Sequence, residues 1–212
     1  MKPPFNLSLY LVLGPQDCNG IDPVDIALAA ANNGTTMVQL RDKSGRSGEQ
    51  VALGKRLKAA LSPLKVPLII NDRVDIALEI GADGAHVGQS DLQAARAREL
   101  LGPDFILGVS ASTRKEFEAI DPKITDYIGL GACFPTGSKD DAEYLDQDLF
   151  RTLTHNSKLP VVGIGGINLA NAGEVIKNGA DGVAVISAIC GTSDPAEASR
   201  ELAQTIKETR GV

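Results

Sequence analysis

The sequence predicts an α/β fold with a single (β/α)8 TIM barrel over residues 1–212. Short apolar runs alternate with amphipathic helical stretches along the whole chain, and no linker or low-complexity segment interrupts them. Eight strand–helix units average about 26 residues each, near the lower limit for a parallel strand, a crossover helix and two turns. An open doubly wound sheet is the alternative, but no Gly-x-Gly-x-x-Gly motif follows the first strand.

Each predicted strand is a short run rich in Val, Ile and Leu, as is typical of parallel strands buried on both faces. We expect these strands at residues 9–13, 37–40, 67–71, 84–88, 106–110, 127–131, 161–165 and 183–187. Helical periodicity follows each strand. The helices are expected at residues 23–33, 48–61, 74–80, 92–101, 114–120, 149–155, 172–178 and 196–209.

A Gly-Ala-Asp-Gly sequence occurs at residues 81–84 and again at 179–182, four strand–helix units later. The first glycine of each can end a helix in the left-handed conformation, and the second can let the backbone turn into the next strand. Recurrent loop chemistry and a half-barrel duplication both explain the repetition. Either explanation places it at the end of the barrel opposite the catalytic face.

The composition excludes several classes of partner. With 21 basic and 27 acidic residues the net charge is −6, which argues against nucleic acid and anionic membranes but permits a phosphorylated small molecule at a local basic cluster. The three cysteines are far apart and only two histidines are present, which excludes a zinc set and indicates a reducing, cytoplasmic location. No apolar run approaches the roughly 20 residues that span a bilayer. The acidic balance is compatible with a monomer or a homodimer.

The chemistry of such barrels lies at the carboxyl ends of the strands, and the second strand ends in a polar cluster. Strand alternation directs Gln39, Arg41 and Lys43 to one side. Two cations and an amide at the barrel mouth suit a diphosphate, whereas a surface charge cluster is the plainer alternative.

Two carboxylates follow neighbouring strands. Asp72 comes directly after the third strand and Asp91 follows the fourth. Because adjacent strands lie about 4.8 Å apart, the two can share a divalent cation, and Mg²⁺ prefers such oxygen ligands. The alternative is that each caps the helix that follows it.

Further polar residues occur at the ends of the fourth, fifth and sixth strands. His86 lies within a strand, and its position fits either a histidine packed in the core or a histidine that lines the pocket. Ser110 can donate a hydrogen bond to a phosphate, while capping explains Thr113. The long loop at 133–141 contains Lys139 and has the composition of a mobile lid.

The last two strands predict a second phosphate site. The expected seventh strand ends at Gly165 and Gly166 follows it, and a short segment follows the eighth strand, which is expected to end at Ser187. In barrels of this class, the backbone N–H groups of these two positions form a phosphate cup.

Seven ordered motifs are similar to those of one family: 39–43 (QLRDK), 70–73 (INDR), 86–91 (HVGQSD), 108–111 (GVSA), 134–136 (FPT) with Lys139, 165–167 (GGI) and 185–189 (VISAI). On these motifs the chain resembles the thiamin phosphate synthase family over essentially its whole length. The resemblance implies a transferase of thiamine biosynthesis. It would couple 4-amino-2-methyl-5-hydroxymethylpyrimidine diphosphate to 4-methyl-5-(2-phosphoethyl)thiazole, giving thiamin phosphate and pyrophosphate by Mg²⁺-assisted dissociative substitution.

The resemblance also implies roles for individual residues. Asp72 and Asp91 would hold Mg²⁺, and Ser110 and Lys139 would be the catalytic residues. The diphosphate would bind to Gln39, Arg41, Lys43, Asn71 and Lys139. His86 and Gln89 would line the pyrimidine pocket, with Ser110 contacting the leaving group or the pyrimidine amine. The thiazole phosphate would bind to Thr136, Ser138, Gly166, Ile186 and Ser187.

The chain departs from the family pattern at three places. Ser112 and Thr113 replace the usual His-Thr, Ser138 replaces a Thr before the loop lysine, and Leu13-Gly14 replaces Thr-Asp. Two alternative functions remain open at this point: an isomerase similar to the thiazole tautomerase, and a non-catalytic barrel that binds thiamin intermediates. Asp72, Asp91 and Lys139 argue against the isomerase.

Overall fold

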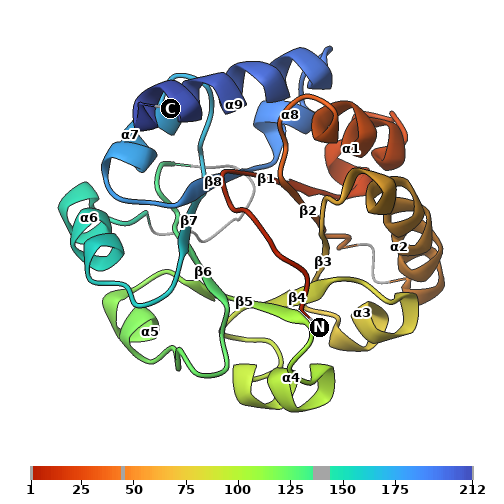
Figure 1. Ribbon diagram of the computed structural model, residues 1–212, viewed down its shortest axis with the longest axis horizontal. Coiled ribbons are helices and arrows are strands. Elements are labelled where there is room, and N and C mark those ends of the chain that lie inside the picture. The colour runs from red at the N-terminus through yellow and green to blue at the C-terminus, as the bar shows by residue number, and fades with distance from the viewer. Residues whose placement is uncertain (1, 44–45, 136–143, 212) are drawn as a thin grey trace.

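A computed structural model describes residues 2–43, 46–135 and 144–211. Eight parallel strands pair in chain order, and the last pairs with the first to close a barrel (Figure 1). The strands are β1 (Leu9–Leu13), β2 (Met37–Leu40), β3 (Leu68–Asn71), β4 (Gly84–Val87), β5 (Ile106–Ala111), β6 (Tyr127–Leu130), β7 (Val161–Ile164) and β8 (Gly182–Val185). The predicted (β/α)8 barrel is therefore confirmed, with strand ends within one or two residues of those expected.

The helices form a ring around the barrel (Figure 1). They are α1 (Pro23–Ala31), α2 (Ser47–Leu61), α3 (Val74–Ile80), α4 (Ala94–Leu101), α5 (Arg114–Glu118), α6 (Gln147–His155), α7 (Ala172–Lys177), α8 (Ser187–Cys190) and α9 (Pro195–Arg210). Two 3-10 turns, η1 (Pro15–Asp17) and η2 (Ser62–Leu64), complete the described elements.

The expected eighth strand was too long at its carboxyl end. Ile186 leaves the extended region with φ −114° and ψ −84°, and Ser187 begins the short helix α8. Ser187 is therefore a helix residue and not a strand residue. The sequence Val-Ile-Ser-Ala has no glycine or proline to mark this boundary, which is why the apolar run alone predicted a longer strand.

Strand alternation separates two hydrophobic layers. One cluster fills the barrel interior and consists of Leu7, Tyr10, Val12, Met37, Ile69, Ile106, Tyr127, Val162 and Ala184. The alternate side chains, such as Leu9, Leu11 and Leu13 of β1, pack in the larger cluster between the barrel and its helices. The same alternation places Gln39 inside the barrel, where its side chain is buried.

A polar side chain joins each even-numbered strand to the odd-numbered strand before it. The carboxylates of Asp83 and Asp181 accept hydrogen bonds from the first backbone N–H of β3 and β7, and that of Asp126 accepts the second N–H of β5, each at 2.8 Å. The Thr36 hydroxyl accepts the first N–H of β1 at 3.1 Å. These four contacts satisfy backbone donors at the amino end of the barrel, which would otherwise be buried without partners.

The repeated Gly-Ala-Asp-Gly sequence lies at this end, as expected. Gly81 ends α3 in the left-handed conformation with φ +63°, and Gly179 follows α7 with φ +97°. The second glycine of the repeat is needed for a different reason from the expected tight turn, as Gly84 illustrates. A Cβ at Gly84 would lie 2.1 Å from the carbonyl oxygen of Ile106, so close packing inside the barrel requires this glycine.

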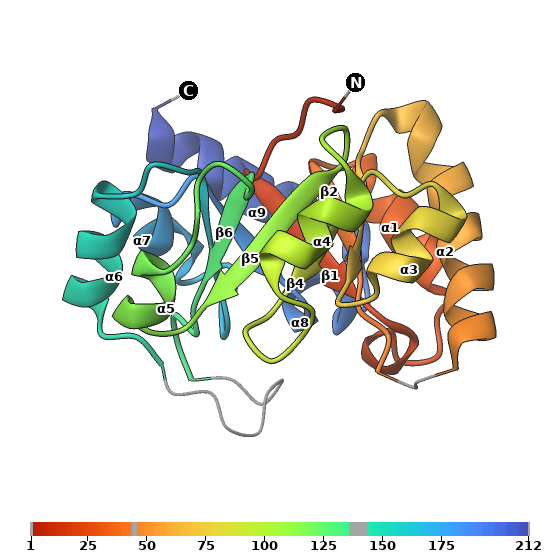
Figure 2. The same cartoon turned by 90° about the horizontal axis from the view of Figure 1, so that it is seen from below.

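The N-terminal segment crosses the amino end of the barrel. Phe5 packs against Tyr127 with ring centroids 6.0 Å apart, and Lys2 forms an ion pair with Asp126. Figure 2 shows this segment at the end of the barrel away from α8. The carboxyl ends of the strands are therefore the open end.

Candidate active site

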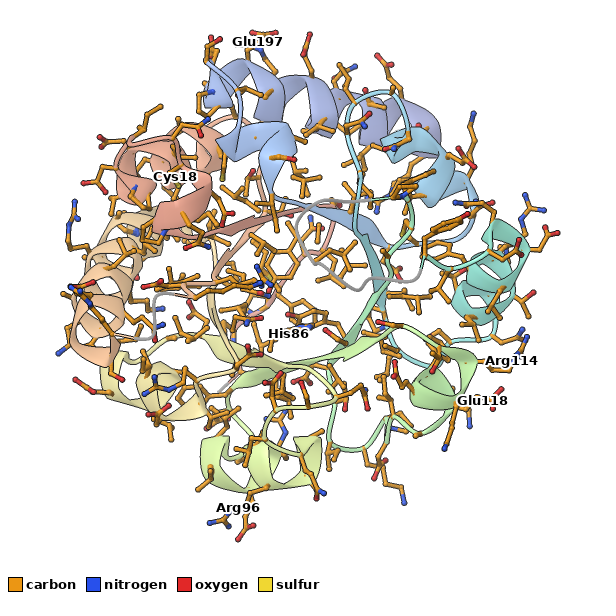
Figure 3. All side chains as sticks on the ribbon, turned by 180° about the vertical axis from the view of Figure 1, so that it is seen from behind. Cys18, His86, Arg96, Arg114, Glu118 and Glu197 are labelled. Carbon is orange, nitrogen blue, oxygen red and sulfur yellow. The ribbon has the colours of Figure 1, made fainter. Side chains whose placement is uncertain are left out.

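A cavity of about 540 Å³ opens at the carboxyl ends of the strands. Ten of the predicted site residues line it: Gln39, Arg41, Asn71, Asp72, His86, Asp91, Ser110, Gly166, Ile186 and Ser187. They come from six of the eight strands or from the loops and the helix that follow them. Figure 3 shows His86 inside the barrel, whereas Arg96, Arg114, Glu118 and Glu197 point outward from the helices.

Two predicted residues with described positions do not line this cavity. Lys43 is exposed beyond the end of β2. Gln89 is also exposed, and its side-chain amide donates to the backbone oxygen of Ser110 at 2.6 Å. Thr136, Ser138 and Lys139 lie outside the described residues, as does most of the predicted lid.

The end of β1 supports the backbone of Arg41. The Arg41 N–H donates to the carbonyl of Leu13 at 2.8 Å, and the side-chain amide of Gln16 donates to the Arg41 carbonyl at the same distance. A Cβ at Gly14 would lie 2.3 Å from that carbonyl. The Leu13-Gly14 departure therefore has a local consequence, because only glycine leaves room for Gln16 to reach Arg41.

An acid lies near the site's cations. Burial raises the pKa of Asp17, and the nearby charges of Arg41 and Lys43 oppose that rise. The Asp17 carboxylate also accepts a hydrogen bond from Gln16 at 2.8 Å. η1 thus contributes a negative charge beside the two cations that β2 supplies.

The two predicted metal-binding carboxylates both face the cavity. Asp72 adopts the left-handed region with φ +61°, and its side chain accepts a hydrogen bond from Asn71 at 2.6 Å. Asp91 accepts the backbone N–H of Gly88 at 2.9 Å. A positive φ at a residue other than glycine carries a cost and often marks a functional site.

The alternative that these carboxylates cap helices is wrong. The residue at the N-cap of α3 is Arg73, and that of α4 is Gln93. Neither helix start has a side-chain cap. By contrast, Thr113 does cap α5 by accepting the Glu116 N–H at 3.2 Å, as the sequence predicted.

A hydrogen-bonded chain of side chains crosses the barrel interior. Gln39 Nε2 donates to the Tyr10 hydroxyl at 2.7 Å, and the Tyr10 and Tyr127 hydroxyls lie 2.9 Å apart. His86 joins the chain at both ring nitrogens, with Nδ1 3.0 Å from the Tyr127 hydroxyl and Nε2 2.8 Å from Ser110 Oγ. His86 is therefore buried and also lines the cavity, so it is both a packed core histidine and a pocket histidine.

The two tyrosines of this hydrogen-bonded chain, Tyr10 and Tyr127, were not predicted as site residues. Burial is the largest cause that raises the pKa of Tyr10 and of Tyr127, so both phenols stay protonated. Tyr10 lines the cavity, whereas Tyr127 lies behind it among the described residues. The signal available in the sequence was that strand alternation places both tyrosines at inward-facing positions, like Gln39 and His86.

The predicted phosphate cup lies across the cavity from Arg41. Gly165 and Gly166 have φ of +96° and +65°, and the backbone oxygen of Gly166 accepts a hydrogen bond from Asn171 at 3.0 Å. A Cβ at Gly166 would lie 2.5 Å from the carbonyl oxygen of Pro135. These glycines are thus required by both conformation and space.

The comparisons with known proteins agree with this geometry. The family described as thiamine monophosphate synthase matches residues 9–189, which spans every strand and ends within α8. The chain belongs to the thiamine monophosphate synthase family. All the motifs that carried the predicted resemblance lie within the matched residues.

Individual members of the thiamine monophosphate synthase family cover nearly the whole chain. A thiamine-phosphate synthase of Xanthobacter autotrophicus is 44% identical over 99% of this chain and 100% of its own length. One of Alkaliphilus oremlandii is 46% identical over 94% of this chain and 95% of its own. The solved structure of thiamine phosphate pyrophosphorylase from Pyrococcus furiosus has a TM-score of 0.88 at 35% identity, with 96% of each chain covered.

These names favour the synthase over the tautomerase-like isomerase and the non-catalytic barrel. Structures with other activities share only the fold. The structure of a 3-hexulose-6-phosphate synthase, for example, has a TM-score of 0.68 at 17% identity. Within the described ranges 2–43, 46–135 and 144–211, no helix has the length and apolar character that crossing a membrane requires.

Proposed function

We propose that this chain is a thiamine-phosphate synthase that uses the cavity at the carboxyl end of its barrel. It couples the pyrimidine diphosphate to the thiazole phosphate, forms thiamin phosphate and releases pyrophosphate. The observation that carries this proposal is the family match across the whole barrel, since it includes the strand ends that line the cavity. The substrates are small phosphorylated molecules, which suits a cavity with a cationic residue on one side and a glycine turn on the other.

The donor set fits a magnesium ion. Asp72 and Asp91 supply carboxylate oxygens on one side of the cavity, and neither is used as a helix cap. Among the described residues no cluster of three or more His, Cys, Asp or Glu side chains is placed to hold a metal. Two carboxylates suit Mg²⁺ in particular, because this ion usually takes its remaining ligands from water and substrate phosphates. When bound, it would neutralise charge that develops on the departing pyrophosphate.

The chain's own cations would act on the same leaving group. Arg41 lines the cavity and Lys43 follows it at the rim, and we assign both to the diphosphate together with Asn71. Charge builds up on the leaving oxygens as the carbon–oxygen bond breaks, so fixed positive charges stabilise the transition state more than the bound substrate. Lys139 joins this group in our proposal through its place in the family motif.

We place the pyrimidine ring against the buried hydrogen-bonded chain. His86 and Ser110 present an imidazole and a hydroxyl in the cavity, which can pair with ring nitrogens and an amine. Gln39 also lines the cavity and stays assigned to the diphosphate. Gln89 contributes through the backbone oxygen of Ser110, to which it donates. The thiazole phosphate then binds at Gly166, Ile186 and Ser187, with Thr136 and Ser138 completing this end.

Pyrophosphate release tests the activity and the metal site together. Purified protein mixed with both substrates and Mg²⁺ is expected to release pyrophosphate only when all three are present. Asp91→Asn should lower kcat at least about 100-fold, because the loss of one transition-state contact typically costs a few kcal/mol. Glu99→Gln removes an exposed carboxylate from α4 and is the matched control. Unchanged, metal-independent turnover in Asp91→Asn would exclude the proposed metal site.

Absence of pyrophosphate release with both substrates bound would instead favour the non-catalytic barrel. A further part of the proposal is a cytoplasmic enzyme, which rests on the cysteine usage described above.

A homodimer is compatible with the acidic charge, and light scattering at several protein concentrations distinguishes it from a monomer.

A further inference from the structure

The hydrogen-bonded chain inside the barrel has one arrangement that satisfies its buried donors. Among the described residues, the Tyr10 hydroxyl contacts only Gln39 and Tyr127. Gln39 already supplies the hydrogen of the first contact. If Tyr127 also donated to Tyr10, the hydrogen of Tyr10 would have no acceptor, and an unsatisfied donor at a side chain only 1% exposed is costly.

The hydrogens therefore point in one direction along the chain. Tyr10 donates to Tyr127, and Tyr127 donates to Nδ1 of His86 at 3.0 Å. With Nδ1 as the acceptor, Nε2 carries the imidazole hydrogen and donates to Ser110 Oγ at 2.8 Å. The Ser110 hydroxyl accepts this bond, so its own hydrogen can point to an acceptor in the cavity.

The contact between His86 and Tyr127 depends on the absence of a side chain at Gly108. His86 lies on β4 and Tyr127 on β6, and both are register partners of Gly108 on the strand between them. A Cβ at this position would lie 2.4 Å from both His86 Nδ1 and the Tyr127 hydroxyl oxygen. The two side chains can meet across an intervening strand only because that position has no side chain.

We infer that Tyr127 is a positioning residue: by donating to His86 Nδ1 it holds the imidazole as the Nε2–H tautomer, which orients the Ser110 hydroxyl hydrogen into the pyrimidine pocket. This inference rests on the proposed function, because it assigns the ordered hydroxyl to the pyrimidine diphosphate. Tyr127 does not line the cavity formed by the described residues. It acts through His86 and Ser110 and does not touch the substrate.

Nitrogen-15 NMR of the histidine rings tests the tautomer directly. The chain has two histidines, and His155 is exposed on α6, so the His155→Gln variant assigns both signals. In the wild-type protein at pH 8 we expect His86 to be protonated at Nε2 and unprotonated at Nδ1. A wild-type His86 protonated at Nδ1 would overturn the inference without the need for any variant.

Three variants test the role of Tyr127. Tyr127→Phe removes the donor to Nδ1 and should give a mixture of His86 tautomers. Gly108→Ala keeps every hydroxyl but separates the two rings, and should have the same effect. Tyr10→Phe removes a hydroxyl one link farther from His86 and should keep the Nε2–H tautomer. Equal disturbance of His86 by Tyr10→Phe and Tyr127→Phe would contradict a specific role for Tyr127.

Kinetics separate positioning from general loss of structure. Tyr127→Phe should lower kcat/KM for the pyrimidine diphosphate about tenfold, as expected when one hydrogen bond is misdirected. The KM for the thiazole phosphate should stay within about twofold, since that end of the cavity is formed by other strands. A parallel rise in both KM values would overturn the inference. Wild-type protein that released no pyrophosphate would overturn the proposed function, while the tautomer result would stand by itself.

Discussion

At the scale of single residues, the site places one acid where the reaction needs cations. Asp17 lies near Arg41 and Lys43 and would reduce the positive charge that they present to the diphosphate in our proposal. Asp17→Asn should therefore tighten binding of inorganic pyrophosphate about two- to fivefold, the range expected for a partly exposed charge pair. Isothermal titration at low and high salt measures this, and the gain should shrink at high salt.

The same substitution has a pH-dependent effect on stability with a defined sign. The pKa of Asp17 is raised in the folded protein, so its charged form is disfavoured by folding. Asp17→Asn should raise the urea midpoint at pH 7, and the gain should disappear as the pH falls below the ordinary range of an aspartate. Glu201→Gln on the exposed face of α9 is the control. A gain that persists at low pH would contradict this account of Asp17.

Most predicted site residues with described positions line the cavity, because they lie at or just beyond the carboxyl ends of the strands. Gln39, Asn71 and Ser110 reach the cavity by strand alternation, which is a property of the local sequence. The partners of His86 were not predicted. Tyr127 meets it from two strands away, and no local pattern specifies a contact that depends on barrel closure and on Gly108.

At the scale of elements, the contacts between neighbouring strands are stabilised by side chains that precede each even-numbered strand. The repeated Gly-Ala-Asp-Gly sequence was attributed to turns, but its aspartates also bind the adjacent strand. Asp83 and Asp181 each accept a backbone N–H, and Asp126 and Thr36 do so at the other two positions without the repeat. A side chain thus accepts a backbone N–H of the preceding odd-numbered strand in all four strand pairs, although the Gly-Ala-Asp-Gly repeat is present in only two of them.

Asp181→Ala should destabilise the protein by about 1–3 kcal/mol, because it leaves the buried N–H of Val161 without its acceptor. Asp181→Asn retains an acceptor oxygen and should recover most of that loss. Asp121→Ala is the control, since Asp121 accepts a backbone N–H in an exposed turn. Urea denaturation measures all three. Equal losses in the Ala and Asn variants would show that charge, and not the hydrogen bond, stabilises this contact.

At the scale of the whole molecule, the barrel could be predicted from the alternation of short apolar runs with helical periodicity. Parallel strands that are buried on both faces need such apolar runs. Chain length indicated eight short strand–helix units, and net charge indicated which classes of ligand to exclude. A net charge of −6 is compatible with the proposed diphosphate site, because Arg41 and Lys43 both follow β2 at the carboxyl end of the barrel. The boundary at Ser187 was mispredicted because α8 depends on a backbone turn at Ile186 that no residue type signals.

Closure of the barrel also buries all three cysteines, which gives a test of the whole fold. Cys18, Cys133 and Cys190 are free thiols with almost no exposed surface. Burial raises the pKa of Cys133 to about 12, so little thiolate forms near neutral pH. In the native protein an aromatic disulfide reagent should label no thiol within minutes, and all three should react in 6 M guanidinium chloride.

The rate of labelling tells which process exposes the thiols. If unfolding limits access, the rate should change little between pH 7 and pH 9, whereas a thiol on the surface reacts faster as it ionises. Ala95→Cys on the exposed part of α4 provides that reference within the same protein. A native thiol that reacts as fast as the cysteine introduced at position 95 would show that the barrel opens locally, without global unfolding. Because all three cysteines belong to the cluster between the barrel and its helices, slow and uniform labelling indicates that this layer opens as one unit.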